Sequence, residues 1–189
     1  MVINIRGTSG SGKSWVMRRL LEEFPNRYEP GLQSTILDDR ILLIGPYYTS
    51  SGAVGVDYML HFMTLDHIHA MAVQKMMPSP GVFEGRTERQ FDHVMFEGLI
   101  VTSVYERYRK MAAEVDLRWV FLNTPLDVCL QQVEKRRQER GERRPFNPEN
   151  TIMKWNDAQR QVDKARSDGM QVWSVSSNEA VDLVTGWLR

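Results

Sequence analysis

Apolar and polar positions along the 189-residue chain follow two different periods. Short apolar runs typical of β-strands alternate with longer segments in which apolar residues recur every three or four positions, as on one face of a helix. Residues 2–6 form the first β-prone run. The segment over residues 14–24 then places apolar side chains at i, i+3, i+4 and i+7: Met17, Leu20, Leu21 and Phe24. The chain therefore begins with a predicted strand and a predicted helix.

The same alternation continues along the chain, with no internal repeat and no low-complexity linker. It predicts further strands over residues 94–96, 117–122 and 172–175, and a β-hairpin over residues 34–45 that folds about Asp38 and Asp39. It also predicts helices over residues 58–77, 103–111 and 152–168. A glycine-rich loop, residues 50–57, precedes the first of these helices.

Residues with known end preferences mark several of these helices. Thr124 is predicted to cap a helix that has Pro125 in its first turn and runs into an arginine-rich stretch. Gly169 is predicted to end the helix over residues 152–168. Ser176 and Glu179 form a predicted capping box for a C-terminal helix. Strands that alternate with helices imply a parallel sheet covered on both faces. We therefore expect an α/β fold with three layers, α/β/α, and a parallel central sheet. The length fits a single domain over residues 1–189.

The turn between the first strand and the first helix has the phosphate-loop form G-x-x-x-x-G-K-S: Gly7, Thr8, Ser9, Gly10, Ser11, Gly12, Lys13 and Ser14. Backbone N–H groups of such a loop surround a polyphosphate at a helix N-terminus. Lys13 is predicted to reach the β- and γ-phosphates, and the Ser14 hydroxyl to ligate Mg²⁺. A chance glycine-rich turn is the alternative, but spacing and strand–helix context both favour binding of a nucleoside triphosphate.

Glu97 follows the predicted strand over residues 94–96. A carboxylate there lies near the magnesium and γ-phosphate, where it could hold a metal-bound water or accept the proton of an attacking hydroxyl. A similar triplet around Glu84 follows a loop rich in proline instead of a strand, so Glu97 is the better candidate. The alternative for Glu97 is a solvated carboxylate at a strand end.

Five arginines fall within nine residues, between two predicted helices: Arg136, Arg137, Arg140, Arg143 and Arg144. Such a segment, residues 136–150, fits a lid that closes over ATP. Arg136 and Arg143 are assigned to ATP binding, and Arg137 and Arg140 to the charge that spreads over the transferring phosphoryl group. A solvated helix face or a nucleic-acid patch are the alternatives. No Asn-Lys-x-Asp guanine-reading motif occurs, so a kinase is favoured over a switch GTPase.

Composition limits the remaining choices. The 24 basic and 24 acidic residues balance, so any nucleic-acid surface must be local. The single cysteine, Cys129, excludes an internal disulfide framework, which suits a reducing cytoplasm. It lies on an apolar helix face and is expected to pack in the core. No apolar run has the length of a membrane span, and we expect neither a signal peptide nor an obligate protein partner. The four histidines have no metal-ligand spacing.

Five segments in order along the chain resemble the tailed-phage P-loop kinases that include 5-hydroxymethyluracil DNA kinase: residues 6–14, 44–47, 55–57, 96–99 and 147–154. The resemblance implies a P-loop NTPase kinase fold with an arginine-rich lid. It also implies transfer of the γ-phosphate of ATP to the 5-hydroxymethyl group of a modified thymine in DNA, a step of thymine hypermodification. The partner would be double- or single-stranded DNA containing 5-hydroxymethyluracil, in the host cytoplasm.

On that resemblance the segment over residues 34–58 lies on the acceptor side, and Asp57 is a candidate general base or acceptor-orienting carboxylate. A helix N-cap is an equal alternative for Asp57. The tyrosines near this loop could stack on a flipped base or pack in the core: Tyr47, Tyr48 and Tyr58.

After the lid, Asn150 or Thr151 is expected to cap the next helix, and Lys154 to meet a phosphate of ATP or DNA or to stay exposed. Two other functions stay open. One is a kinase of a free nucleotide, nucleoside or other small hydroxyl compound. The second is a binding or remodelling protein that hydrolyses ATP without an acceptor.

Overall fold

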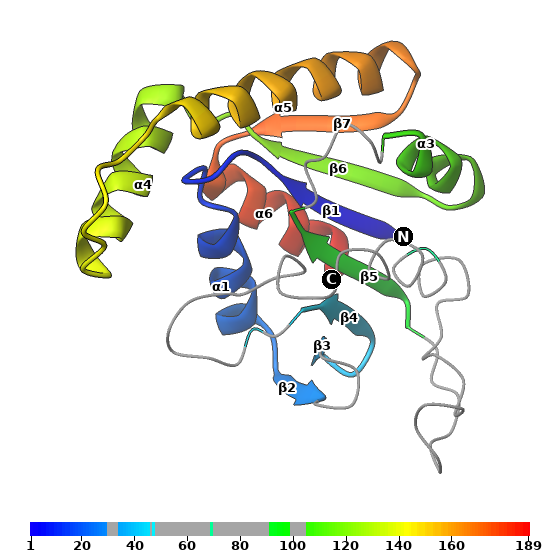
Figure 1. Ribbon diagram of the computed structural model, residues 1–189. Helices are drawn as coiled ribbons and strands as arrows, with labels where there is room; N and C mark the ends of the chain where they lie inside the picture. Colours follow the sequence, from blue (N-terminus) through cyan, green and yellow to red (C-terminus); the bar gives the residue numbers. More distant parts are fainter. Residues whose placement is uncertain (30–33, 46, 48–68, 70–90, 99–104) are drawn as a thin grey trace, which may run out of the picture.

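Figure 1 shows a β-sheet lying between two layers of helices. The computed structural model describes residues 1–29, 34–45, 47, 69, 91–98 and 105–189. Within this part of the chain seven strands pair in the order β2-β3-β4-β5-β1-β6-β7. Their bounds are β1 Val2–Arg6, β2 Asn26–Glu29, β3 Ser34–Leu37, β4 Ile41–Ile44, β5 His93–Glu97, β6 Leu117–Leu122 and β7 Gln171–Val175.

The sheet is parallel from β4 to β7 and antiparallel at its other edge. Each of β4, β5, β1, β6 and β7 runs parallel to its neighbour in that series. β3 pairs antiparallel with both β2 and β4. The predicted hairpin is confirmed, since Asp38 and Asp39 form its turn with left-handed φ values of 48° and 58°. The parallel sheet is confirmed for the centre, and the antiparallel β2 was not predicted because its four residues, Asn26–Glu29, are largely polar.

Helices cover both faces of the sheet, as the three-layer prediction requires. On one face Ile5 packs with apolar residues of α1 and α6, among them Leu20 and Val184. On the opposite face Trp119 packs with α3 and α5 in a cluster that contains Tyr108. The described helices are α1 Lys13–Glu23, α3 Tyr105–Glu114, α4 Leu126–Glu139, α5 Glu149–Ser167 and α6 Ser177–Leu188.

Helix ends agree with the sequence signals in two places. The capping box of α6 is confirmed, because the Glu179 N–H donates to Ser176 Oγ at 3.3 Å and the Ser176 N–H donates to Glu179 Oε2 at 2.8 Å. Gly169 follows α5 with φ of 76°, as expected for a glycine that ends a helix. α5 begins three residues earlier than predicted. The predicted loop over residues 50–57, the alternative carboxylate Glu84 and nearly all of the predicted helix over residues 58–77 lie outside the described residues.

The parallel order brings three strand ends to one edge of the sheet. β1 lies between β5 and β6, with Ile5 opposite Glu97 and Arg6 opposite Phe121. The turns that follow these strands therefore converge, and they carry the phosphate loop, Glu97 and Thr124. None of the helices described here combines the length and the apolar character that crossing a membrane demands.

Candidate phosphate-binding and catalytic site

The phosphate loop is held by a hydrogen bond within it and by packing against α4. The Ser11 N–H donates to the Thr8 carbonyl at 3.2 Å within the loop. Gly10 has φ of 81°, and a Cβ on it would lie 2.3 Å from the Cys129 carbonyl oxygen. No side chain fits at that distance, so glycine is required for the loop to rest against α4. Cys129 is buried, as predicted, and burial raises the pKa of its thiol.

Lys13 lies over the loop from the first turn of α1. Its Nζ donates to the Gly7 carbonyl at 2.9 Å and to the Thr8 carbonyl at 3.0 Å. The ammonium group is therefore held at the concave side of the loop backbone by oxygen acceptors. Phosphate oxygens are acceptors of the same kind with a greater charge, so the arrangement fits the predicted phosphate contact.

Ser14 and Glu97 meet although 83 residues separate them in the chain. The Ser14 hydroxyl donates to Glu97 Oε1 at 3.3 Å. Glu97 ends β5 and is 5% exposed, which excludes the alternative of a solvated strand-end carboxylate. The next residue, Gly98, turns the chain away with φ of 91° while its N–H donates to the Ile5 carbonyl at 3.1 Å. Two side-chain oxygen atoms, of the type that hard cations prefer, thus lie together at the N-terminus of α1.

Thr124 ties the phosphate loop to the turn after β6. Its hydroxyl donates to the Ser11 carbonyl at 2.8 Å. The prediction that Thr124 caps α4 is wrong, because Pro125 occupies the N-cap position and no side chain caps that helix. The indole N–H of Trp155 in α5 donates to the Thr124 carbonyl at 3.2 Å, which extends the connection to the helix after the arginine-rich segment.

The start of α5 also approaches the phosphate loop. The Thr8 hydroxyl donates to the Thr151 carbonyl at 3.5 Å, and Thr151 is buried. Neither Asn150 nor Thr151 caps this helix as predicted. Instead Asn147 Oδ1 accepts from the Glu149 N–H at 2.9 Å, because the chain turns two residues earlier. Lys154 is exposed in the first turns of α5.

The arginine-rich segment occupies the far end of α4 and the connection to α5, away from the phosphate loop (Figure 1). Arg136 and Arg137 lie in the last turn of α4, and Arg140 follows it. Arg136, Arg140 and Arg143 are exposed. Arg137 pairs with Glu142 at 2.7 Å and donates to the Arg144 carbonyl at 3.0 Å, so the segment is closed on itself.

Arg6 is buried, and in the sequence it was noted only as the first residue of the segment 6–14. Its Nη1 donates to Asn4 Oδ1 at 3.1 Å and its Nη2 donates to Gln161 Oε1 at 2.6 Å. Asn4 in turn donates to the Phe96 carbonyl at 3.4 Å, beside Glu97. Hydrogen bonds between polar groups therefore link β5, β1 and α5. A polar residue at an inward position of a buried strand was the available signal.

The candidate acceptor residues are only partly covered. Tyr47 is 8% exposed and packs in the cluster with α1 and α6, which fits the core alternative for this tyrosine. Asp57, Tyr48 and Tyr58 lie outside the described residues, so their roles stay predictions.

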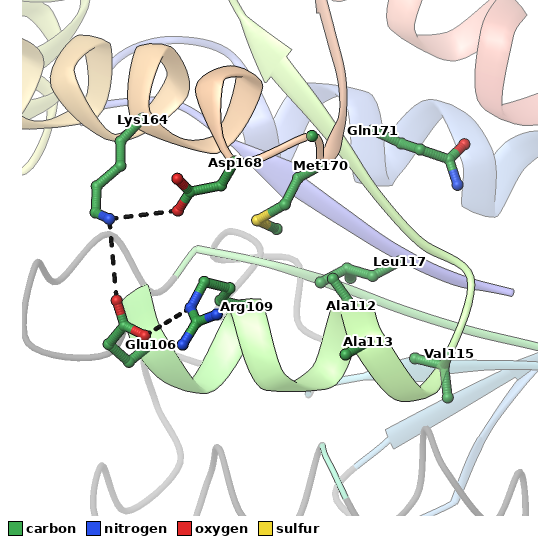
Figure 2. Close-up of a pocket in the computed structure, with 11 residues that line it drawn as sticks. Glu106, Arg109, Ala112, Ala113, Val115, Leu117, Lys164, Asp168, Met170 and Gln171 are labelled. Atoms are coloured by element: carbon green, nitrogen blue, oxygen red, sulfur yellow. Dashed lines mark hydrogen bonds and ion pairs between the residues drawn. The ribbon is translucent and has the colours of Figure 1, made fainter.

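A hollow of about 630 Å³ lies elsewhere, between α3 and the turn from α5 to β7 (Figure 2). It is lined by the first residues of β6 and β7, at the opposite end of these strands from the phosphate loop. Its charged side chains pair with one another: Arg109 with Glu106 at 2.7 Å, and Lys164 with Asp168 at 3.3 Å and with Glu106 at 3.9 Å. The hollow is therefore separate from the phosphate site and its charges are satisfied internally.

Comparison with known proteins finds phage relatives of similar length. A 5-hmdU DNA kinase of Pseudomonas phage PaMx11 is 33% identical over 184 residues, which cover 90% of this chain and 88% of the relative. A 5-hmdU DNA kinase of Pseudomonas phage M6 is 31% identical over 180 residues, with coverage of 90% and 88%. A solved deoxyadenosine kinase from M. mycoides with bound dATP aligns over 100% of this chain and 99% of its own, with 13% identity and a TM-score of 0.43. No family model matches the chain.

Proposed function

This chain belongs to the family of phage 5-hmdU DNA kinases, and from that premise we propose that it phosphorylates 5-hydroxymethyluracil in DNA with ATP as donor. The resemblance inferred from the sequence motifs is thereby confirmed. The observation that carries the proposal is the pairing of Ser14 with Glu97 at the mouth of a complete phosphate loop. Together with the loop, this pairing offers a site for the phosphate donor, and the relatives' name, 5-hmdU DNA kinase, supports modified DNA as the acceptor.

The donor site consists of the loop from Gly7 to Ser14. Its backbone N–H groups and the N-terminus of α1 bind the phosphates, and Lys13 exchanges its carbonyl acceptors for oxygens of the β- and γ-phosphates. Arg136 and Arg143 contact ATP from the lid over residues 136–150 once the lid closes. Closure requires that the arginine-rich segment move toward the loop, and Arg136 and Arg143 are exposed and so available for this contact.

Ser14 and Glu97 would hold Mg²⁺. Both supply oxygen, the ligand type that this cation prefers, and their side chains already lie within 3.3 Å of one another. The cation supplies charge neutralisation at the β- and γ-phosphate oxygens. Glu97 is buried, so its carboxylate is kept from bulk water and interacts strongly with positive charge placed beside it.

In the reaction the 5-hydroxymethyl oxygen attacks the γ-phosphorus, and the bond to the bridging oxygen of ADP breaks. The hydroxyl proton passes to a carboxylate, for which Asp57 and Glu97 are the candidates. Arg137 and Arg140 stabilise the charge that spreads over the equatorial oxygens. Arg137 would exchange its ion pair with Glu142 for this contact, so closing the lid replaces one charge partner with another.

The deciding experiment supplies γ-labelled ATP together with one of four acceptors. These are duplex DNA containing 5-hydroxymethyluracil, the same sequence as single strands, a thymine-only duplex, and the free hydroxymethyl nucleotide. We expect label on the modified DNA and none on the thymine control.

Preferential labelling of the free nucleotide would replace the proposal with a small-molecule kinase. ATP consumption that no acceptor stimulates would replace it with an ATP-hydrolysing binding protein. A Lys13→Ala protein run in parallel identifies label added by a contaminating kinase, because that label would persist.

A further inference from the structure

Arg6, the residue before the phosphate loop, carries its guanidinium into the interior on the face of the sheet that α3 and α5 cover. The side chain is 2% exposed, and the guanidinium carbon lies 3.8 Å from the ring centre of Trp119 and 4.7 Å from that of Tyr108. Its hydrogen bonds go to the side-chain amide oxygens of Asn4 and Gln161, and the Tyr108 hydroxyl is a further neutral partner. Two neutral rings and two neutral amides thus surround a cation.

Within the described residues no carboxylate pairs with Arg6. Other arginines of the protein do have such partners: Arg118 pairs with Asp116 at 3.0 Å and Arg137 with Glu142 at 2.7 Å. Burial lowers the pKa of Arg6 from its ordinary value, but guanidinium groups stay protonated in proteins. The protein therefore keeps a buried positive charge that the described residues do not neutralise.

A buried charge without a counter-ion is costly, and mobile ions in solution screen it little. Such a charge acts on whatever charge is placed nearby, and Arg6 immediately precedes Gly7, the first residue of the loop. We propose that Arg6 is a fixed positive charge that strengthens binding of the donor phosphates at the loop without touching them. The inference rests on the proposed donor site. On this proposal the negative phosphates of the bound nucleotide act as the counter-ion that Arg6 lacks among the described residues.

The size of the effect follows from Coulomb's law. Two unit charges about 10 Å apart, at an effective dielectric constant of about 20, interact strongly enough to change a dissociation constant about tenfold. The effect should grow with the number of negative charges on the ligand. A role in structure alone, in which Arg6 only joins β1 to α5, predicts no such dependence on ligand charge.

Replacing Arg6 would remove both its charge and its hydrogen bonds, so the decisive variants keep it. Gln161→Glu places a carboxylate where an amide oxygen now accepts from Arg6 at 2.6 Å. Asn4→Asp does the same at 3.1 Å. Both substitutions are nearly isosteric, and each neutralises the guanidinium in place. Gln159→Glu is the matched control, because it adds the same charge two residues away on α5 outside the buried cluster.

The measurement is the dissociation constant of ATP, ADP and adenosine for each protein by calorimetry, together with its thermal unfolding midpoint. For Gln161→Glu and Asn4→Asp we expect ATP to bind about tenfold more weakly, ADP to lose less, and adenosine to lose nothing. For Gln161→Glu the unfolding midpoint should equal or exceed that of the wild type, because the buried cation gains a partner. Asn4→Asp also loses the hydrogen bond that the Asn4 amide donates to the Phe96 carbonyl, so its midpoint is expected to be lower than that of Gln161→Glu. Gln159→Glu should bind all three ligands as the wild type does.

Three results would overturn the inference: wild-type affinity for ATP in a folded Gln161→Glu protein, an equal loss for ATP, ADP and adenosine, or unfolding of both carboxylate variants. Failure of the wild type itself to bind ATP would instead reject the proposed donor site. The two failures are therefore distinguishable.

Discussion

The phosphate loop and the arginine-rich segment are both rich in groups that suit phosphate, yet the protein holds them differently. The loop is fixed from several sides: by Thr124 at the Ser11 carbonyl, by α4 against Gly10, and by Thr8 against α5. The segment over residues 136–144 is exposed, and its arginine contacts are local to the segment itself. We infer that the donor site is preorganised, whereas the lid must be ordered by its ligands. Losses in the donor site should therefore be independent of salt, and losses in the segment salt-dependent.

The largest effect is expected at Glu97. Glu97→Gln removes the negative charge from the pair with Ser14 and should abolish both transfer and background ATP hydrolysis. Asp57→Asn is the comparison variant and should abolish transfer while it spares hydrolysis, since Asp57 is assigned to the acceptor. Both activities are measured from γ-labelled ATP, as labelled DNA and as released phosphate. Identical losses in the two variants would show that the two carboxylates do not divide the work.

Lys13→Ala should lower kcat by roughly 10²-fold or more, about 3 kcal/mol, because the ammonium contacts charge that grows during transfer. Circular dichroism should show an intact fold, since Lys13 Nζ donates to carbonyls of the adjacent loop and lies outside the hydrophobic core. Lys110→Ala, at the surface of α3, is the control and should leave kcat unchanged. A folded Lys13→Ala protein with near wild-type turnover would contradict the donor-site assignment.

The two regions also differ in how far the sequence predicted them. The loop motif, the strand before it and the helix after it were predicted together, because spacing and backbone preference are local properties. Ser14 and Glu97 were each assigned to the magnesium, but the hydrogen bond between them was not predicted. The parallel strand order explains it, because it brings distant strand ends to one edge. The antiparallel β2 was missed since its polar residues carry no apolar pattern.

Residues that act across elements were the hardest to predict. Thr124 was interpreted as a helix cap because threonine before proline is typical of one. Its hydroxyl instead donates to the Ser11 carbonyl in the phosphate loop. Asn4, Arg6 and Gln161 have no spacing that relates them, and only the packing of α5 on β1 brings them together. A polar residue within a buried strand marks such a position, but local sequence patterns do not identify the partner that it meets. Such contacts depend on which helix covers which strand.

A smaller and salt-dependent effect is expected in the arginine-rich segment. If the arginines of the segment and Lys154 contact the DNA backbone as well as ATP, the KM for modified DNA should rise steeply with salt, because each DNA contact releases counter-ions. Substituting Arg143 and Arg144 by Ala should flatten the log–log slope by about one to two units. The double variant Arg109→Ala/Arg189→Ala removes two exposed arginines that pair with Glu106 and Glu23, and should leave the slope unchanged. A flat wild-type series would argue against DNA as the acceptor.

The smallest effect is expected at Thr124, where a single hydrogen bond orients the loop. Thr124→Val keeps the shape of the side chain but leaves the Ser11 carbonyl without its 2.8 Å donor, a loss of about 1 kcal/mol. Because the bond lies within the donor site, we expect ATP to bind about fivefold more weakly at every salt concentration.

Thr185→Val is the matched control for this bond, since the buried Thr185 hydroxyl in α6 has no hydrogen-bond partner within the described residues. Its removal should leave the Kd for ATP unchanged and should maintain or raise the free energy of unfolding. Calorimetric titration and urea unfolding of both variants test the pair. Equal ATP affinity in the two proteins would show that the loop keeps its phosphate-binding conformation without Thr124, and the fixed donor site would then depend on α4 and α5 alone.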